Sequence, residues 1–520
     1  MRLHDFFDYR AREGAHNDFA VRGDRHVTYE EAAREVNRIA NALIASGLRP
    51  GDRVAVLSKN SIEYVLFYFG ASKVGVVPVP VNYRLAPPEW SYIINDAESK
   101  AVFASAMYAD AVNGVRGELK HAQSFIVVGG EATGWRPYAD WVALQPDTAP
   151  DVRVTKDDDV YQMYTSGTTG NPKGAVLTHH AVTSQLAQVS PIAQMSPGER
   201  VLIVAPLYHA AAAITMFSSV YWGATLYIQE DFNPVDVVRA LDEEQISVAL
   251  LVPAMIQALL VFVPDVAQRE YRDLREIIYG ASPIAEATLR RAAEVFKCDF
   301  AQAYGMTETT ACLTALLPAH HRQALDGRAE LLLSAGRPLP GVELRAVDED
   351  DQPVPRGTVG EIVGRGDNLM RGYWNLPDES AEALRGGWMH TGDAGYIDEE
   401  GFVYIQDRVK DMIVSGGENV YPRHVEDVIF QHPAVADVAV IGVPDPTWGE
   451  TVKAVVVLKQ GQTATADEIM QFCEGKLGGF QRPRSVDFID ALPRNASGKV
   501  LKKELRAPYW QGQKRAVAGS

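Results

Sequence analysis

Short apolar runs alternate with longer helix-like stretches through the N-terminal half of the chain, and this alternation restricts the possible fold more than any other feature. The candidates for buried strands are residues 53–57, 76–81, 100–104, 200–204, 225–228, 248–252 and 276–279. Helical patterns separate these runs. One helix is expected to begin with a capping box at Thr28 and Glu31 and to end at Gly47, and another is expected over 61–74. The repeated strand–helix–strand order predicts an α/β fold, with parallel sheets covered by helices on both faces.

The chain is too long for one hydrophobic core. At 520 residues it exceeds the size at which single domains stop growing, so two or more domains are expected. From residue 335 to 406, glycine and proline are frequent and the strand candidates are short, which predicts a small antiparallel β unit. Strand candidates at 437–443 and 453–458 and a helix at 466–477 predict a compact α+β module after it. We place a domain boundary at 408–411.

Composition and charge argue against several kinds of partner. The net charge is −17, which opposes binding to nucleic acid or to an anionic membrane surface. The cysteines at 298, 312 and 473 have no metal-binding or redox spacing, as expected of reduced thiols. The start of the chain is too charged for a signal peptide, and the most apolar stretch, 248–264, is too short to span a membrane. We therefore expect a soluble, cytoplasmic protein without a transmembrane segment.

Residues 164–174 have the sequence Tyr-Thr-Ser-Gly-Thr-Thr-Gly-Asn-Pro-Lys-Gly, which combines hydroxyls, glycines and one lysine. Glycines let a backbone approach a ligand closely, and successive exposed N–H groups bind anions. The hydroxyl donors are Thr165, Ser166, Thr168 and Thr169, and Lys173 adds a positive charge. A flexible linker is the alternative, but a strand at 160–164 and a helix starting at 175 are expected to flank the segment. The segment predicts a polyphosphate cradle, with a spacing that differs from a Walker A loop.

Three further positions suit a nucleotide site only in combination with that cradle. Glu308 is a candidate Mg²⁺ ligand in a segment whose aromatic residue and glycine could face a purine, although a plain helix start is an equal alternative. Asp393 could accept ribose hydroxyls, although a turn aspartate is the simpler interpretation. Lys499 follows a Ser-Gly pair and could extend into a neighbouring site, although an exposed lysine is the default. The histidine pairs at 179–180 and 320–321 are expected on the surface.

Six segments of the chain occur in an order that resembles the motifs of the adenylate-forming superfamily, which includes acyl-CoA synthetases, luciferases and peptide-synthetase adenylation domains. These segments are 164–174, 206–209, 304–308, 390–393, 407–411 and 493–499. The resemblance covers almost the whole chain. It implies a large N-terminal domain (1–407) of two doubly wound sheets with a small β-barrel-like unit. A hinge (408–411) containing Lys410 and a small mobile α+β C-terminal domain (412–520) that carries a catalytic lysine would follow.

The resemblance also implies a two-step reaction. A carboxylate attacks the α-phosphorus of ATP to give an acyl-adenylate and pyrophosphate, and the thiol of the co-substrate CoA then displaces AMP. The implied catalytic residues are Lys173, His209, Glu308 and Lys499, with Lys499 acting in the adenylation step only. The implied ATP or AMP contacts are Thr165, Ser166, Gly167, Thr168, Thr169, Gly170, Lys173, Gly280, Ala281, Gln302, Ala303, Tyr304, Thr307, Asp393, Arg408 and Lys499. Mg²⁺ would bind Thr165 and Glu308. CoA would contact Arg84, Gly417, Trp448, Phe480 and Arg482.

The stretch after His209 carries the information about the acid. Relatives that activate amino acids place an aspartate there, whereas residues 210–217 contain no acidic or basic side chain, so an ammonium or a second carboxylate would stay unpaired. The implied pocket residues are His209, Ala213, Phe217, Ala281, Ala303, Tyr304 and Leu313. The small alanines favour a medium or long acyl chain or a bulky aryl or alicyclic acid. Alanines that serve only helix packing are the alternative.

Three other functions share parts of these motifs. A fatty acyl-AMP ligase that hands its product to a carrier protein would keep the adenylation residues, and a luciferase-like oxygenase would keep the same first step. A catalytically silent nucleotide-binding regulator is the third alternative, and the joint presence of Lys173, Glu308 and Lys499 argues against it. The expected partners are a carboxylic acid, ATP and CoA, without nucleic acid. The sequence leaves the oligomeric state open, with a homodimer among the options.

Overall fold

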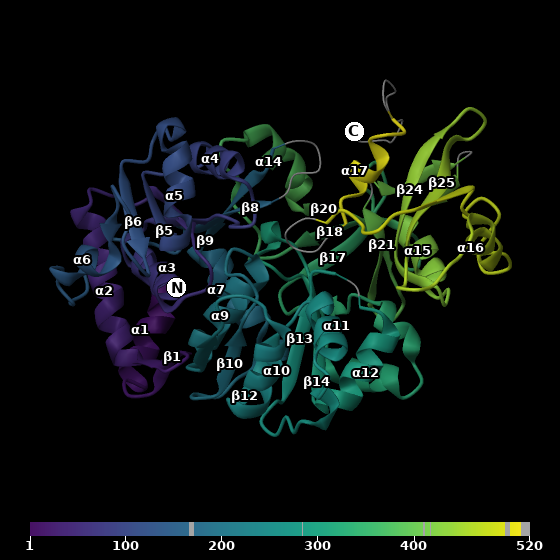
Figure 1. Ribbon diagram of the computed structural model, residues 1–520. Coiled ribbons are helices and arrows are strands. Elements are labelled where there is room, and N and C mark those ends of the chain that lie inside the picture. Colours follow the sequence, from purple (N-terminus) through teal and green to yellow (C-terminus); the bar gives the residue numbers. More distant parts are fainter. Residues whose placement is uncertain (166–170, 283, 409–410, 416–417, 495–499, 511–520) are drawn as a thin grey trace. The chain divides into compact units, whose positions relative to one another are not determined.

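The computed structural model describes the 520 residues of the chain except 166–170, 283, 409–410, 416–417, 495–499 and 511–520 (Figure 1). The side chains of Ala193, Arg408 and Asn419 also lie outside the description. The chain forms two compact units. The first contains Met1–Glu343 and Gly364–Met389, and the second contains Leu344–Val363 and His390–Ser520. Among the described residues, no helix combines the length and the apolar character that crossing a bilayer requires.

The first unit contains a nine-stranded mixed sheet. Its strand order is β16 (Arg337–Pro338), β15 (Thr314–Leu316), β14 (Asp299–Tyr304), β13 (Glu276–Gly280), β12 (Ile246–Leu250), β10 (Arg200–Ile203), β11 (Thr225–Ile228), β1 (Asp18–Arg22) and β2 (Arg25–Thr28). From β14 to β1, neighbouring strands are parallel, whereas β2 and β15 pair antiparallel with their neighbours. The connections are α9 (Ala210–Trp222), α10 (Pro234–Glu243), α11 (Pro253–Phe262) and α12 (Glu286–Phe296) (Figure 1). Parallel pairing puts the carboxyl ends of β13 and β14 at one edge.

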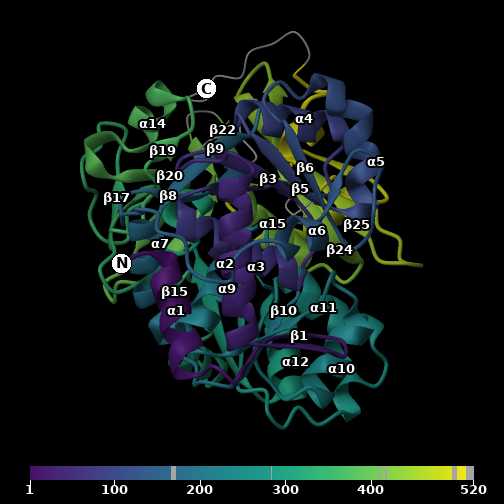
Figure 2. The same ribbon diagram turned by 90° about the vertical axis from the view of Figure 1, so that its left-hand side faces the viewer.

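A second, five-stranded sheet of this unit is parallel throughout. Its order is β4 (Val77–Pro80), β3 (Arg53–Leu57), β5 (Ala101–Ser105), β6 (Ser124–Val128) and β7 (Arg136–Pro137). The helices near it are α2 (Tyr29–Ala45), α3 (Ile62–Val74), α4 (Pro87–Asp96), α5 (Ala106–Val115) and α6 (Tyr138–Ala143). Figure 2 shows α2 and α3 side by side. The predicted capping box is present, because the Thr28 hydroxyl accepts from the Glu31 N–H. The predicted α/β fold is confirmed.

A third, small sheet corrects one prediction. Its strands are β19 (Gly372–Tyr373), β9 (Lys173–Thr178) and β8 (Asp159–Thr165), all antiparallel. The helix expected from residue 175 is therefore wrong, since residues 175–178 continue a strand and the helix α7 (His179–Gln188) begins only after Thr178 caps it. The apolar run at 175–177 is buried, and such a short run has no period that separates strand from helix. Residues 164–174 thus join two strands of a hairpin.

The second unit contains two sheets. The first has the order β17 (Glu343–Val347), β18 (Gly360–Arg365), β20 (Met389–Ile397) and β21 (Val403–Arg408). The other has β23 (Glu418–Val420), β22 (Ile413–Ser415), β25 (Gly449–Leu458) and β24 (Val435–Asp445), with β26 (Ser485–Phe488) pairing with β25. Its helices are α15 (Pro422–Phe430), α16 (Ala466–Phe472) and α17 (Lys502–Arg506). The boundary that we place at 408–411 lies between these two sheets, inside the second unit, and stays a prediction.

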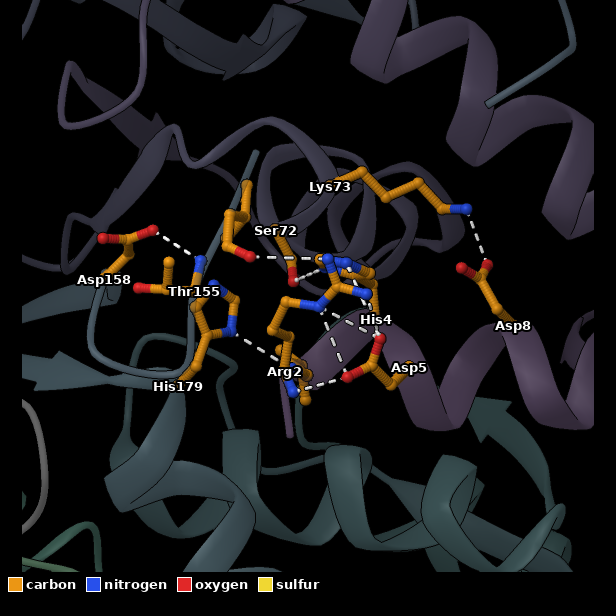
Figure 3. A network of polar contacts seen from close by, with 11 residues as sticks. Arg2, His4, Asp5, Asp8, Ser72, Lys73, Thr155, Asp158 and His179 are labelled. Atoms are coloured by element: carbon orange, nitrogen blue, oxygen red, sulfur yellow. Dashed lines mark hydrogen bonds and ion pairs between the residues drawn. The ribbon is translucent and has the colours of Figure 1, made fainter. Parts of the chain in front are cut away.

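Buried histidines fasten the N-terminal helix α1 (Leu3–Glu13) to the first unit. Figure 3 shows His4 directed at Ser72 of α3, with Nδ1 and Oγ 2.9 Å apart. The Leu3 N–H donates to Nδ1 of His179 at 3.0 Å, and the two imidazole rings meet edge to face at 5.9 Å. His321 is also buried, 2.8 Å from the Tyr279 hydroxyl. The expectation of surface histidines is therefore wrong for one member of each pair, because only the fold determines burial.

These buried imidazoles make stability depend on pH. Burial lowers the pKa to about 4 for His4 and His321 and to about 3 for His179. Below pH 6.5 the unfolded chain binds protons that the folded chain refuses, so stability falls as pH drops from 6.5 towards 4. Each histidine contributes about 1.4 kcal/mol per pH unit to this slope.

We predict that His321→Gln flattens the pH dependence of the unfolding midpoint between pH 6.5 and 4, because one titrating group is removed. Thermal unfolding at a series of pH values measures both slopes. The exposed His16 provides a matched control, since His16→Gln should leave the slope unchanged. Equal slopes for wild type and His321→Gln would contradict the assignment.

Candidate active site

The hairpin places two of the predicted residues opposite each other. Thr165 is the last residue of β8 and Lys173 the first of β9, and they are direct partners in the ladder. Directly paired residues of an antiparallel ladder present their side chains on the same face. The predicted hydroxyl and amine are therefore brought together at the hairpin end. Ser166, Gly167, Thr168, Thr169 and Gly170, which the cradle prediction also includes, lie outside the described residues.

A tyrosine that sequence reasoning missed links this hairpin to Glu308. Tyr373 of β19 pairs with Ala175 of β9, and its ring centroid is 5.3 Å from Nζ of Lys173. Its hydroxyl donates to Oε1 of Glu308 at 2.8 Å. Glu308 lies in a single turn of 3-10 helix, Thr307–Thr309, and is 4% exposed. The structure thus brings Glu308 close to Thr165 and Lys173, although more than a hundred residues separate it from them in the sequence.

Glu308 has the properties of a ligand for a divalent cation. Among the residues that the structure describes, no lysine, arginine or histidine nitrogen lies within 4.0 Å of its carboxylate. A buried carboxylate without a counter-ion is costly, and a bound cation would remove that cost. The described part of the chain has no group of three acidic, histidine or cysteine side chains placed so that they could hold a metal ion by themselves. This donor set fits Mg²⁺, which takes one or two carboxylates and completes its shell with phosphate oxygens and water.

A buried arginine fastens the hairpin to the five-stranded sheet. The Arg53 guanidinium, from β3, pairs with Asp159 at 3.1 Å and donates to Oε1 of Gln162 at 3.0 Å. It also stacks on the ring of Trp374, 3.3 Å from the centroid. Three strands, β3, β8 and the continuation of β19, are therefore tied to one side chain. Sequence reasoning missed Arg53 because nothing local distinguishes it from an exposed arginine at a strand start.

The residues predicted to frame adenine lie at the carboxyl ends of β13 and β14. Tyr279 pairs with Gln302 and Gly280 with Ala303, so the predicted positions are neighbours. A Cβ on Gly280 would lie 2.3 Å from the carbonyl oxygen of Ala303, so only glycine fits there. The Gln302 Oε1 is buried and has no hydrogen-bond partner among the described residues, which leaves it able to accept from a ligand.

A strained turn follows these strand ends and precedes β15. Thr310 and Ala311 adopt φ values of 53° and 88°, which are costly for residues other than glycine. The buried Asn368 supports this turn, since its Nδ2 donates to the carbonyls of Thr309 and Cys312, each at 2.9 Å. The Thr310 hydroxyl in turn donates to the Asn368 carbonyl at 2.6 Å. Asn368 therefore helps to fix the segment that carries Thr307 and Glu308.

The predicted acyl-pocket residues lie on α9 and next to the strained turn. Ala213, Phe217 and Leu313 are all buried. Phe217 packs edge to face against Tyr68 at 5.2 Å and against Phe69 at 5.9 Å, both on α3. Core packing thus explains why Phe217 is buried. The alternative that the α9 side chains serve only helix packing therefore stays open beside the acyl pocket. The pocket itself stays a prediction.

The charge of Arg84 acts on His209, although the two were predicted to serve different ligands. His209 is half-buried at the start of α9, with its ring 4.4 Å from that of Tyr208. Burial and then the charge of Arg84 lower the pKa of His209 to about 4, so its imidazole is neutral at neutral pH. The Arg84 guanidinium is itself 3.3 Å from the Asp231 carboxylate. A neutral imidazole can donate one hydrogen bond and accept another.

In the second unit, two predicted ribose contacts are cross-strand partners. Asp393 of β20 pairs with Arg408 of β21 in the antiparallel ladder. Of the predicted CoA contacts, Trp448 and Phe480 are exposed at 49% and 41%, and Arg482 forms an ion pair with Glu474 at 2.9 Å. Gly417, Lys410, Lys499 and the side chain of Arg408 lie outside the described residues, so these predictions stay untested.

The helix α17 forms ion pairs with carboxylates that lie just before the predicted hinge and at its end. Lys502 of α17 is 2.8 Å from the Glu426 carboxylate and 3.4 Å from that of Asp407. Arg506 of the same helix is 2.7 Å from Asp411. Burial alone would lower the pKa of Lys502, but the two carboxylates raise it. The C-terminal helix is therefore held by charges on both sides of residues 408–410.

We predict that Lys502→Met destabilises the second unit by roughly 3 kcal/mol, because it takes away the cation that two largely buried carboxylates share. Thermal or urea unfolding measures the change. A second substitution, Glu426→Gln, should recover part of the loss. The neighbouring Lys503 is exposed, so Lys503→Met serves as the control. Equal stability of the two lysine variants would refute a structural role for Lys502.

Comparison with known protein families now identifies the chain. Residues 7–374 match the AMP-binding enzyme family, and residues 424–499 match the AMP-binding enzyme C-terminal domain. Fatty acid–acyl-carrier-protein ligase ScoC from Streptomyces coeruleorubidus is 41% identical, covering 95% of this chain and 93% of its own. Feruloyl-CoA synthase from an Amycolatopsis species is 38% identical, covering 96% and 97%.

Solved structures agree with the family match. A fatty acyl CoA synthetase of Mycobacterium tuberculosis superposes with a TM-score of 0.79 at 34% identity, covering 99% of both chains. The anthranilate CoA ligase AuaEII in complex with anthranoyl-AMP gives a TM-score of 0.88 at 27% identity, covering 98% of this chain and 97% of its own. The chain therefore belongs to the AMP-binding enzyme family, as an adenylate-forming enzyme of the acyl-CoA synthetase type. The predicted family, fold class and enzyme class are confirmed.

Proposed function

We propose that the chain is an ATP-dependent carboxylic acid–CoA ligase that converts an acid, ATP and CoA to acyl-CoA, AMP and pyrophosphate through an acyl-adenylate. The observation that supports this most is the meeting of Thr165 and Lys173 at the hairpin end beside the buried Glu308. That arrangement offers a cation for phosphate oxygens and a carboxylate for a metal ion. It lies within the segment that matches the AMP-binding enzyme family.

In the first step, a carboxylate oxygen of the acid attacks the α-phosphorus of ATP, and the bond to pyrophosphate breaks. Two anions approach each other, so positive groups fixed in advance supply most of the rate enhancement. Lys173 would hold the charge of the departing pyrophosphate, and Lys499 would bridge the acid carboxylate and the α-phosphate. Glu308 and the Thr165 hydroxyl would hold Mg²⁺, which when bound neutralises charge on the phosphate oxygens.

In the second step, the sulfur of the CoA thiol attacks the carbonyl carbon of the adenylate, the thiol proton is lost to solvent, and AMP leaves with the bonding electron pair. His209 would border this carbonyl, as the family resemblance implies. Its neutral imidazole could accept or donate a hydrogen bond there without adding a charge. Gly417, Trp448, Phe480 and Arg482 would contact CoA, as the family resemblance implies, once the C-terminal part turns about Lys410.

We infer a hydrophobic acid, either a medium- or long-chain fatty acid or a bulky aryl or alicyclic acid. The stretch 210–217 offers no charged group for an amino acid or a dicarboxylate. Relatives named for fatty acids and for ferulic acid support both options. A panel of acids tested for ATP-dependent pyrophosphate release, with and without CoA, decides between them. Fatty or aryl acids should give acyl-CoA, and release restricted to amino acids would overturn the proposal.

The second candidate function is transfer of the acyl group to a carrier protein. It is favoured by one observation, the 41% identity to a relative named as a fatty acid–acyl-carrier-protein ligase. The same assay separates the two, because CoA should accelerate turnover of a CoA ligase. Turnover that responds only to a phosphopantetheinylated carrier protein would assign the chain to the second function.

We predict that Lys499→Ala abolishes formation of the acyl-adenylate but spares thioester formation from a supplied acyl-adenylate. The reason is that Lys499 would contact the α-phosphate only in the first step. Single-turnover assays of each half-reaction measure this, with the exposed Lys503→Ala as the control. An equal loss in both half-reactions would show that Lys499 serves both steps or the fold.

A further inference from the structure

Tyr373 lies between two opposite charges that do not touch each other. Its ring centroid is 5.3 Å from the Lys173 ammonium nitrogen, and its hydroxyl donates to the Glu308 carboxylate at 2.8 Å. Lys173 and Glu308 both belong to the described part of the chain, and no ion pair within 4.0 Å joins them. One aromatic side chain therefore satisfies the cation with its ring face and the anion with its hydroxyl.

The backbone explains why the ring reaches both groups. Tyr373 is directly opposite Ala175 in the ladder of β19 with β9, so Lys173, two residues from Ala175, is its diagonal neighbour on the same face. The Tyr373 N–H donates to the Ser380 hydroxyl at 2.8 Å, and the Trp374 N–H donates to the Gly174 carbonyl at 2.8 Å. The neighbouring Trp374 ring is stacked on Arg53. Tyr373 is thus held by a fixed strand.

A lysine and a carboxylate that flank one side chain would otherwise attract each other, because opposite charges inside a protein are screened less than in water. Such a pair would occupy both groups, and a ligand carrying phosphates and a metal ion would have to break it before binding. Instead, Glu308 accepts a hydrogen bond from a neutral hydroxyl, and Lys173 faces an aromatic ring. An arriving ligand therefore has no ion pair to break, and the contacts with Tyr373 cost it less to replace.

We propose that Tyr373 is a positioning residue that keeps Lys173 and Glu308 from pairing, so that a nucleoside triphosphate with its divalent cation finds both charges available. The proposal rests on the function proposed above, and it adds a residue that the family motifs in the sequence did not single out. Tyr373 acts through the two charged groups, and no contact between Tyr373 and the substrate is required.

The test is calorimetric binding of Mg²⁺ with α,β-methylene ATP, which cannot form an adenylate, to the full-length chain. Tyr373→Phe keeps the ring but releases the Glu308 carboxylate from its hydrogen bond, so that the carboxylate can turn towards Lys173, and it should weaken binding about tenfold. Tyr373→Leu also removes the aromatic face and lets the charges pair, so it should weaken binding further. Tyr271→Phe, which removes a buried hydroxyl that donates to the Val266 carbonyl elsewhere, should bind like wild type.

A double-mutant cycle separates positioning from folding. In a Lys173→Met background no ammonium remains to pair with Glu308, so Tyr373→Leu should then change affinity by less than about twofold. Full additivity of the two losses, or wild-type affinity of Tyr373→Leu, would overturn the proposal. If Tyr373→Leu fails to fold by circular dichroism, the Tyr373→Phe affinity decides, and an unchanged value overturns it.

The outcome is independent of the proposed function as a whole. Wild-type chain that binds the nucleotide analogue but releases no pyrophosphate with any acid would refute the ligase function, while the affinities of the variants still test Tyr373. Wild-type chain that makes acyl-CoA, together with a Tyr373→Leu variant of normal affinity, would refute only the positioning role.

Discussion

The antiparallel ladder between β8 and β9 is the interaction on which the candidate site depends. Its last rung sets Thr165 opposite Lys173, and the free side of β9 accepts β19, which delivers Tyr373. Tyr373 then meets Glu308, which lies in a turn between β14 and β15 of the nine-stranded sheet. Arg53 fastens the same hairpin to the other sheet. A small sheet of three strands therefore joins side chains from distant parts of the chain, and its backbone hydrogen bonds fix their spacing.

Charge explains why such local arrangement matters in this chain. With a net charge of −17, the protein as a whole repels ATP and a carboxylate substrate. Binding two anions therefore requires cations placed individually at the site, and Lys173 is kept available rather than neutralised by Glu308. The buried Glu308 accepts a hydrogen bond from Tyr373, and under the proposed function it would gain a positively charged partner when a divalent cation binds. Under that proposal, the site would be more complementary to a phosphate–metal complex than to either part alone.

The sequence predicted the regular elements well and the long-range contacts poorly. Caps such as Thr28 are local, so the helix they begin could be placed before the fold was known. The motif residues were found through their order along the chain. The prediction of a helix from residue 175 was wrong because a buried apolar run of three residues has no periodicity that separates strand from helix. Pairing with β8 makes this run a strand. Tyr373 and the buried His179 went unnoticed because their partners lie far away in the sequence, where no local pattern points to them.

The most direct test of the central claim follows the oxygen atoms of the acid. If the carboxylate attacks the α-phosphorus of ATP and the thiol then attacks the acyl carbon, one carboxylate oxygen must leave with AMP. An acid labelled with ¹⁸O in its carboxylate should therefore give AMP that carries one labelled oxygen, with unlabelled pyrophosphate, by mass spectrometry. Formation of ADP with label in inorganic phosphate would indicate an acyl-phosphate and contradict the adenylate route.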